Sequence, residues 1–222
     1  MGRPARGQAL LSRERIGAAA LALVDEHGPE GLTMRALAER LGVKAASLYG
    51  HVQGKDQLLD LLSELVNDEI DLAPLEDSDW SRGLTAYAHG YRAVFLRHPN
   101  TIALLARRRV AAERALAGYD AVLALLARAG LAPEHAAEVA AVLDYLVLGS
   151  ALETFTAGFT RPPAEYAPRF PSLATALGAA TAGDTAPTDL DDRGFSLGLA
   201  YLLTGIEARA SRADQGAGML PS

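Results

Sequence analysis

Apolar residues recur at three- and four-residue spacing along most of the chain, a pattern typical of amphipathic helices. The first such stretch begins at Ser12 and ends at Gly28-Pro29, because glycine and proline terminate helices. A second stretch begins at Thr33, a good N-cap, and ends at Gly42, which can adopt the left-handed conformation that side chains resist. The pattern therefore predicts two helices within the first 42 residues.

The residues after Gly42 predict a further helix that begins near Lys44, so that residues 33–55 form a helix-turn-helix. Ala45, Leu48 and Val52 fall at helical spacing and are expected to pack inward. Small, hydroxyl and cationic side chains then occupy the outward face: Lys44, Ala46, Ser47, Tyr49, Gly50 and His51. Such a face suits a DNA groove, because small residues allow close approach and the polar groups can bind phosphates and base edges. The alternative is two ordinary helices of a helical core.

The remaining chain is predicted to be helical as well. A connecting helix follows in GKDQLLDLLSELVNDEI, which runs out of the small domain. The later predicted helices run from Trp80 to His98, Thr101 to Ala106, Val110 to Ala129, Pro133 to about Thr156 and Asp191 to Ala210. The proline-rich residues 158–189 are expected to form a mobile, irregular loop or a single short helix near Ser172 to Ala179. No strand run or internal repeat is visible, and the predicted fold class is all-α.

The predicted organisation is a three-helix DNA-binding domain followed by a larger helical domain for dimerisation. The boundaries are a basic arm at residues 1–11, the helix-turn-helix domain at 12–56, the larger domain at 57–210 and a disordered tail at 211–222. Arg3 and Arg6 beside Pro4 could place the arm in a narrow minor groove, or the arm could be an incidental tail.

Charge is distributed unevenly along the 222 residues. The net charge is -6, which by itself argues against a nucleic-acid partner. Residues 1–55, however, carry eight basic against five acidic side chains, a net charge of +3, so the remainder carries -9. A basic head on an acidic body orients itself on a polyanion. Cysteine is absent and no apolar run is long enough for a membrane span, which predicts a cytoplasmic, nucleoid-associated protein without a membrane partner.

Two helices, from Pro133 and from Asp191, are apolar around most of their circumference. One face of each can serve the core of the body, and the other is expected to pack against a second copy in a four-helix bundle about a two-fold axis. The alternative is that one chain buries both faces. A homodimer would bind a palindromic operator whose half-sites lie on one DNA face about 34 to 36 Å apart, or at a related spacing.

An enzyme is not expected, although residues 194–198 spell G-x-S-x-G. That motif requires a strand before the serine, whereas an amphipathic helix surrounds Ser196, and no Asp and then His follow it. The histidines show no tight ligand spacing, so neither a metal site nor another cofactor is expected.

The run RIGAAALALVDEHGPEGLTMRALAERLGVKAASLYGHVQGKDQLLD resembles the TetR family of bacterial transcriptional regulators. APLEDSDW, RHP near residue 98, ARAGLAPEHA and LGSALE are similar to its tetracycline-repressor branch, and the resemblance is looser after Glu153. The resemblance implies that DNA is contacted by Thr33, Arg35, Lys44, Ala45, Ala46, Ser47, Tyr49, His51 and Lys55. Gly50 departs from the larger residue often found there, which is expected to weaken the helix by about 0.5 to 1 kcal/mol.

The same resemblance implies a small-molecule effector. The expected pocket residues are Glu69, Tyr87, Tyr91, Leu105, Arg108, Tyr145, Glu153 and Phe155. Histidines that hold magnesium-tetracycline in the tetracycline repressor are absent from these positions, so a different, largely apolar ligand is expected. Arg108 and Glu153 are its candidate polar anchors, or they serve only a helix end and an ion pair. The chain is thus interpreted as a repressor released from DNA by its effector. The alternatives are an activator or ligand-independent regulator of the same fold, or an all-α scaffold or enzyme.

Overall fold

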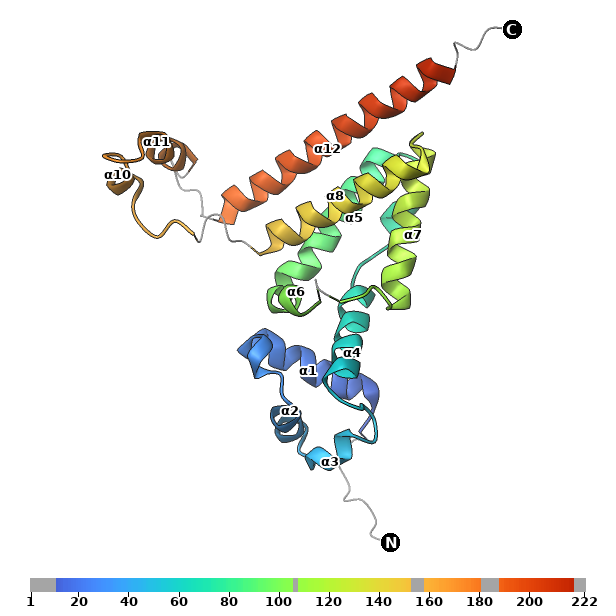
Figure 1. The fold of residues 1–222 in the computed structure, drawn as a ribbon, viewed down its shortest axis with the longest axis vertical. Helices are drawn as coiled ribbons and strands as arrows, with labels where there is room; N and C mark the ends of the chain where they lie inside the picture. The colour runs from blue at the N-terminus through green and yellow to red at the C-terminus, as the bar shows by residue number, and fades with distance from the viewer. Residues whose placement is uncertain (1–10, 106–107, 153–157, 181–187, 218–222) are drawn as a thin grey trace. The chain divides into compact units, whose positions relative to one another are not determined.

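The computed structural model describes residues 11–105, 108–152, 158–180 and 188–217, with side chains in the last range described for residues 190–211. Every regular element in these ranges is a helix (Figure 1). The predicted all-α fold is confirmed for this part of the chain. Two compact units form, one from residues 1–70 with 97–118 and the other from residues 71–96 with 119–222.

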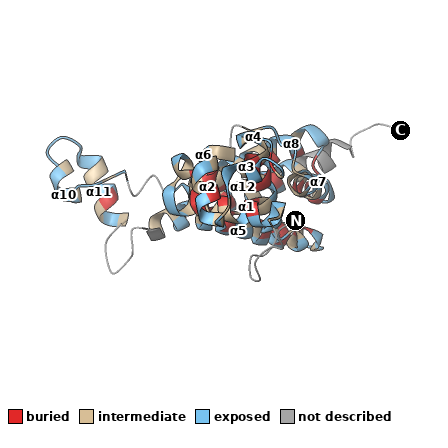
Figure 2. Ribbon diagram, turned by 90° about the horizontal axis from the view of Figure 1, so that it is seen from below, coloured by how far each residue is buried: buried red, intermediate tan, exposed pale blue. Residues whose placement is uncertain are grey.

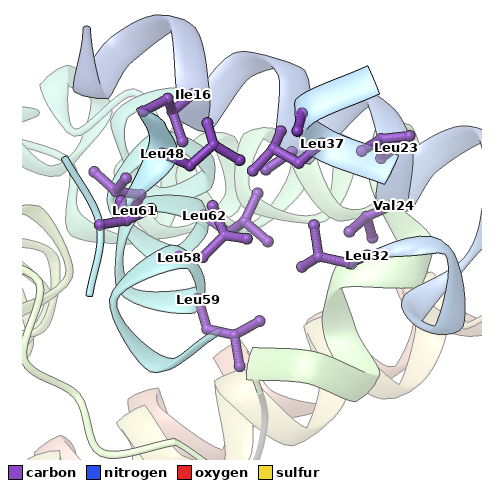
Figure 3. Close-up of a cluster of buried hydrophobic side chains, with 13 residues drawn as sticks. Ile16, Leu23, Val24, Leu32, Leu37, Leu48, Leu58, Leu59, Leu61 and Leu62 are labelled. Atoms are coloured by element: carbon purple, nitrogen blue, oxygen red, sulfur yellow. The ribbon is translucent and has the colours of Figure 1, made fainter. Parts of the chain in front are cut away.

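The first unit is built on four N-terminal helices and a later one. These are α1 (Arg13–His27), α2 (Met34–Leu41), α3 (Ala45–Leu48), α4 (Lys55–Asp68) and α6 (Pro99–Leu105), with a 3-10 turn, η1, at Pro29–Gly31. As predicted, the Ser12 hydroxyl caps α1 by accepting a hydrogen bond from the Arg15 N–H at 3.3 Å. Figure 3 shows buried side chains from α1 to α4 converging on one core, among them Ile16, Leu37, Leu48 and Leu62, all fully buried. This core fixes α3 against the other helices.

The second unit contains the longer helices of the body. It comprises a 3-10 turn η2 (Ala73–Glu76), α5 (Trp80–Arg97) up to Leu96, α7 (Glu113–Arg128) from Tyr119, α8 (Pro133–Ala151), α10 (Pro163–Tyr166), α11 (Pro171–Ala180) and α12 (Thr188–Ala217). α8 and α12 pack side by side. Gly83 on α5 lies against η2 so closely that a Cβ there would stand 2.5 Å from the Pro74 carbonyl oxygen. A side chain at Gly83 would therefore push α5 away from this turn.

Several helix ends differ from the predicted ones. α6 begins at Pro99 rather than Thr101, and α10 begins at Pro163 in a segment expected to be irregular. Both differences have one cause: proline lacks an N–H, which is not needed in the first turn of a helix, so it can start a helix as well as stop one. α12 extends from Thr188 to Ala217, past both predicted ends. The predicted ends at Ala106 and Thr156 lie outside the described residues.

Most helices carry both buried and exposed residues (Figure 2). α10 and α11 are mostly exposed or intermediate, and Leu177 is the buried residue of α11. No helix in the described part of the chain has both the length and the apolar character that crossing a membrane requires.

Candidate nucleic-acid interface and effector residues

The turn between α2 and α3 is formed as the sequence predicts. The Thr33 hydroxyl accepts a hydrogen bond from the Ala36 N–H at 3.1 Å and so caps α2. Gly42 ends α2 with a φ of 67°, in the left-handed region, and the Val43 N–H then bonds to the Ala38 carbonyl at 3.0 Å. Because Leu37, Leu48 and Val52 are fully buried beneath this turn, the helix-turn-helix is a packed structural unit.

The outward face of α3 carries the side chains predicted to meet DNA. Lys44, Ala46, Ser47 and Tyr49 are exposed, Tyr49 to 55%. Ala45 is exposed as well, so the prediction that it packs inward was wrong, whereas its assignment to the DNA contacts stays a prediction. The reason is the shortness of α3: only Leu48, in its last position, faces the core, and Ala45 lies at the opposite end of the single turn.

α3 ends earlier than the apolar spacing suggested. After Leu48 the chain turns, and the N–H groups of His51 and Val52 both donate to the Leu48 carbonyl at 2.9 Å. Gly50 lies in this turn, where its low helix propensity agrees with the end of the helix. Tyr49 and His51 therefore belong to the turn that follows α3 rather than to the helix.

Positive charge lies at both ends of this face. Lys44 precedes α3, and Lys55 opens α4, where the positive end of the helix dipole adds to its charge. No ion pair involves either lysine within the described residues. Arg35 is 90% exposed on its side chain and pairs with Glu39 at 2.9 Å. Such an exposed pair is weak, so Arg35 can exchange Glu39 for a phosphate or base at little cost.

Arg108 lies against the first two turns of α4. Its guanidinium donates to Asp56 Oδ1 at 3.2 Å and also to Asp60. Arg108 therefore offsets the negative charge of two carboxylates there, one of them on the residue that follows Lys55. Sequence reasoning placed Arg108 among the effector residues and did not anticipate this contact, because the two segments are far apart in the chain.

Glu69 and Leu105 are the other predicted effector residues in the first unit. Glu69 accepts a hydrogen bond from Arg97 at 2.6 Å and contacts the His98 ring at 3.2 Å. Burial raises the pKa of Glu69, but the bond from Arg97 and the charges of Arg97 and His98 outweigh it, so the net pKa lies below its usual value. Leu105 is the last residue of α6.

Tyr87 and Tyr91 lie in the second unit, one turn apart on α5, with ring centroids 5.7 Å apart. The Tyr91 hydroxyl donates to Asp144 Oδ1 on α8 at 3.3 Å, and the Tyr119 hydroxyl on α7 donates to Oδ2. Burial raises the pKa of Tyr91 and of Tyr119, and the Asp144 carboxylate adds to both increases, so the phenols remain protonated donors. Burial also raises the pKa of Asp144, against the opposing effect of the two phenol bonds.

Sequence reasoning missed Asp144 and Tyr119. The available signal was one carboxylate inside the apolar run AAVLDYLVLG of α8, since a buried charge needs partners. Tyr91, Tyr119 and Asp144 are brought together from three helices, and we call them the phenol–carboxylate cluster. The cluster is a hydrogen-bonded polar group in a mostly apolar interior.

Tyr145 points elsewhere. It is 74% exposed and lines a hollow of about 340 Å³ between α8 and α12, together with Gly149, Gly194 and Phe195. Further large apolar side chains are exposed on the same two helices: Val142 on α8, and Leu197 and Tyr201 on α12. The predicted effector residues Glu153 and Phe155 lie outside the described residues.

The G-x-S-x-G sequence lies inside α12, and the Ser196 hydroxyl donates to the Asp192 carbonyl at 2.9 Å. The strand-to-helix turn that a hydrolase serine requires is therefore not formed at this position. Among the described side chains, no group of three or more His, Cys, Asp or Glu residues is arranged to hold a metal ion.

Two parts of the chain each match the model of a known protein family. Residues 16–62 match the model for bacterial regulatory proteins of the tetR family, and residues 73–210 match the tetracyclin repressor-like C-terminal domain. The tetracycline repressor protein class A from transposon 1721 of Escherichia coli is 34% identical over 197 residues, covering 86% of this chain and 88% of that protein.

Two further similarities concern actinomycete proteins. An HTH-type transcriptional regulator of Saccharopolyspora erythraea is 37% identical over 145 residues, which span 65% of this chain and 61% of that regulator. The structure of ActR from Streptomyces coelicolor in complex with actinorhodin superposes with a TM-score of 0.75 at 31% identity, covering 90% of this chain and 97% of ActR. The chain therefore belongs to the tetR family of bacterial regulatory proteins.

Proposed function

We propose that this protein is a ligand-responsive, DNA-binding transcriptional repressor. One observation carries the proposal: in a member of this family, α3 presents exposed lysine, hydroxyl and small side chains above a buried Leu48. The direct test is to sequence the DNA that the purified protein retains from fragments of its own genome. Enrichment of one short sequence is expected, and recovery of DNA without any sequence preference would contradict the proposal.

The residues of the exposed face are proposed to have different roles in DNA binding. Tyr49, His51 and Lys55 follow or flank α3 and are proposed to hold phosphates, which fixes the position of the protein on the duplex. Arg35, Lys44 and Ser47 are proposed to reach base edges. Thr33, Ala45 and Ala46 complete the surface by allowing the backbone to approach closely.

Replacing Lys55 with alanine is expected to weaken binding to all DNA sequences alike. Losing one phosphate contact should make the slope of log affinity against log salt concentration shallower by about one. Fluorescence anisotropy at several salt concentrations measures this slope. Arg193→Ala, which removes an exposed arginine of α12, is the matched control and should leave the slope unchanged. An unchanged slope for Lys55→Ala would exclude the phosphate contact.

Two copies are proposed to assemble through the exposed apolar faces of α8 and α12. Val142, Tyr145, Leu197 and Tyr201 would be covered there by the same residues of the partner, as a two-fold axis requires. The symmetric dimer would then bind a palindromic operator. A monomer at micromolar concentration in sedimentation analysis would contradict both the bundle and the symmetric operator.

The effector is proposed to be a small, largely apolar molecule bound in the body. Tyr87 and Tyr91 offer aromatic surface, and the phenol–carboxylate cluster offers a hydrogen-bonding anchor. The other positions that the family resemblance assigns to the effector are Glu69, Leu105 and Arg108 in the first unit and Tyr145, Glu153 and Phe155 in the second, and their roles stay proposals. ActR, which this chain resembles in structure, binds actinorhodin, and that likeness supports a ligand other than magnesium-tetracycline.

Effector and operator DNA are expected to oppose each other. The effector should weaken operator binding by the same factor by which the operator weakens effector binding, a coupling of about 1 to 3 kcal/mol. Titrating apolar aromatic compounds and magnesium-tetracycline with and without operator DNA measures both factors. Tight tetracycline binding, or an effector affinity that is the same with and without operator DNA, would contradict this account.

A further inference from the structure

His98 lies at the junction of three helices of the first unit. It separates α5 from α6, and α6 packs on both α1 and α4. The ring Nδ1 is 2.8 Å from Asp25 Oδ2 on α1, and the ring Nε2 is 3.2 Å from Glu69 Oε1 at the end of α4. The side chain is only 13% exposed. Both ring nitrogens therefore face carboxylate oxygens in a largely buried position.

The positions of the two carboxylates favour one protonation state of the His98 ring. A neutral imidazole has one N–H donor and one lone pair, whereas an ionised carboxylate only accepts. A neutral His98 could thus bond to one carboxylate and would direct a lone pair at the other. The imidazolium donates to both, and each of these charge-assisted bonds is stronger than a neutral one. The contacts seen here fit the protonated ring.

The surrounding charges agree with this state. Asp25 from α1 and Glu69 from the end of α4 contact His98, and Arg97 from the end of α5 donates to Glu69 at 2.6 Å. With His98 protonated, this group of four is electrically neutral. The other oxygen of Asp25, Oδ1, is buried without a hydrogen-bond partner, so His98 supplies the one hydrogen bond recorded for this carboxylate.

The same junction is held by a second, uncharged contact. The Asn100 side-chain amide of α6 donates to the Val24 carbonyl at 3.1 Å and to the Asp25 carbonyl at 3.3 Å. α1 in turn holds α2 through the pair of Arg40 with Glu26, which includes a bond of 2.8 Å. Loss of the His98 contacts would therefore affect the helix-turn-helix by two routes, one through α1 and the other through α4.

We propose that His98, in its protonated form, is a positioning residue that clamps α6 onto α1 and α4 and so holds the DNA-binding helices in their binding arrangement. The clamp is complete at low pH and weakens as rising pH removes the ring proton, so operator affinity falls with it. The consequence for DNA rests on the proposed function; the protonated clamp itself does not.

The clamp is tested first without DNA. Ring-15N histidine spectra collected from low to high pH should show the His98 signals, identified by their loss in His98→Gln, with both nitrogens protonated at the low-pH end. A neutral-tautomer pattern at the lowest pH at which the chain stays folded would overturn the proposal. This measurement uses the full chain alone, so it stands even if the DNA-binding function were disproved.

The consequence is tested with Asp25→Asn. An asparagine amide can donate to the lone pair of a neutral ring, so this variant keeps the clamp while removing its need for the second proton. We expect parent affinity for retained operator fragments to fall about tenfold more than that of Asp25→Asn between pH 6.5 and 8.5. His51 is present in both proteins, so any effect it has on affinity is the same for both and cancels from the ratio of the two affinities. Equal pH dependence in the two proteins would overturn the proposal.

A matched pair of histidine variants completes the test. His98→Gln should weaken operator binding about tenfold at pH 6.5 and much less at pH 8.5. His135→Gln makes the same chemical change on α8, in the second unit, and should alter neither value. If His98→Gln weakened binding equally at both pH values, the ring would act only by its shape and the proposal would be wrong.

Discussion

Replacing Asp192 with alanine is expected to lower the free energy of unfolding by about 2 to 3 kcal/mol, although Asp192 is itself exposed on α12. The cost arises at its partner. Arg92 on α5 is only 6% exposed, donates to Asp192 Oδ1 at 2.6 Å and to Ser150 Oγ at 3.0 Å, and lies 4.9 Å from the centre of the Phe195 ring. Without Asp192 a buried cation keeps one neutral partner, and Nη2 already has none.

The control for this prediction removes the cation instead of its partner. Arg92→Met replaces the guanidinium with an apolar chain of similar length and should cost less than Asp192→Ala, because no buried charge remains. The double variant should be as stable as Arg92→Met alone. Urea unfolding followed by the fluorescence of Trp80, the one tryptophan of the chain and a residue of α5, measures all three. Equal losses for the two single variants would contradict a buried-charge origin.

Some helix starts and stops were predictable from single residues. Ser12 and Thr33 cap α1 and α2, Gly42 ends α2 in the left-handed conformation, and Gly130 follows α7 with a φ of 90°. These signals are local, because a cap needs only a hydroxyl three residues before a free N–H, and a left-handed end needs only a residue without a Cβ. The family resemblance and the buried Leu48 followed from the same short segment.

Contacts between distant segments were not predictable in the same way. Asp144 meets Tyr91 and Tyr119, and Arg108 meets Asp56 and Asp60, because helices far apart in the sequence pack together. Hydrophobic periodicity gives the buried face of each helix but not its neighbour or its axial register. Polar partners depend on that register to within a few ångströms, so a polar residue can be singled out while its role is not.

Tyr145, one of the proposed effector residues, illustrates the same limit. It follows Asp144 directly in the sequence, so the two side chains leave a helix in directions about 100° apart. Asp144 turns into the phenol–carboxylate cluster, whereas Tyr145 turns outward to the hollow between α8 and α12. The sequence can therefore indicate the right part of a helix for a site. A shift of a single residue along that helix, however, decides whether a side chain lies inside the body or on its surface.

Leu48→Ala should remove about 2 to 5 kcal/mol from the free energy of unfolding and abolish tight operator binding. Leu48 is the single buried residue of α3, is fully buried, and packs with Ile16, Leu37 and Leu62 (Figure 3). A helix of one turn has too few internal hydrogen bonds to persist by itself, so its position depends on this side chain. Losing it should release the exposed face that is proposed to contact DNA.

Leu116→Ala is the matched control for Leu48→Ala, because it makes the same chemical change at a site that is 46% exposed. It should change the unfolding free energy by no more than about 0.5 kcal/mol and leave operator affinity intact. Circular dichroism during urea unfolding and anisotropy with retained operator fragments measure the two quantities. Where Leu48→Ala remains folded at low temperature, a lost operator affinity with preserved helix content would show that Leu48 positions α3. Preserved affinity would mean that α3 keeps its place without the core contact, contrary to this prediction.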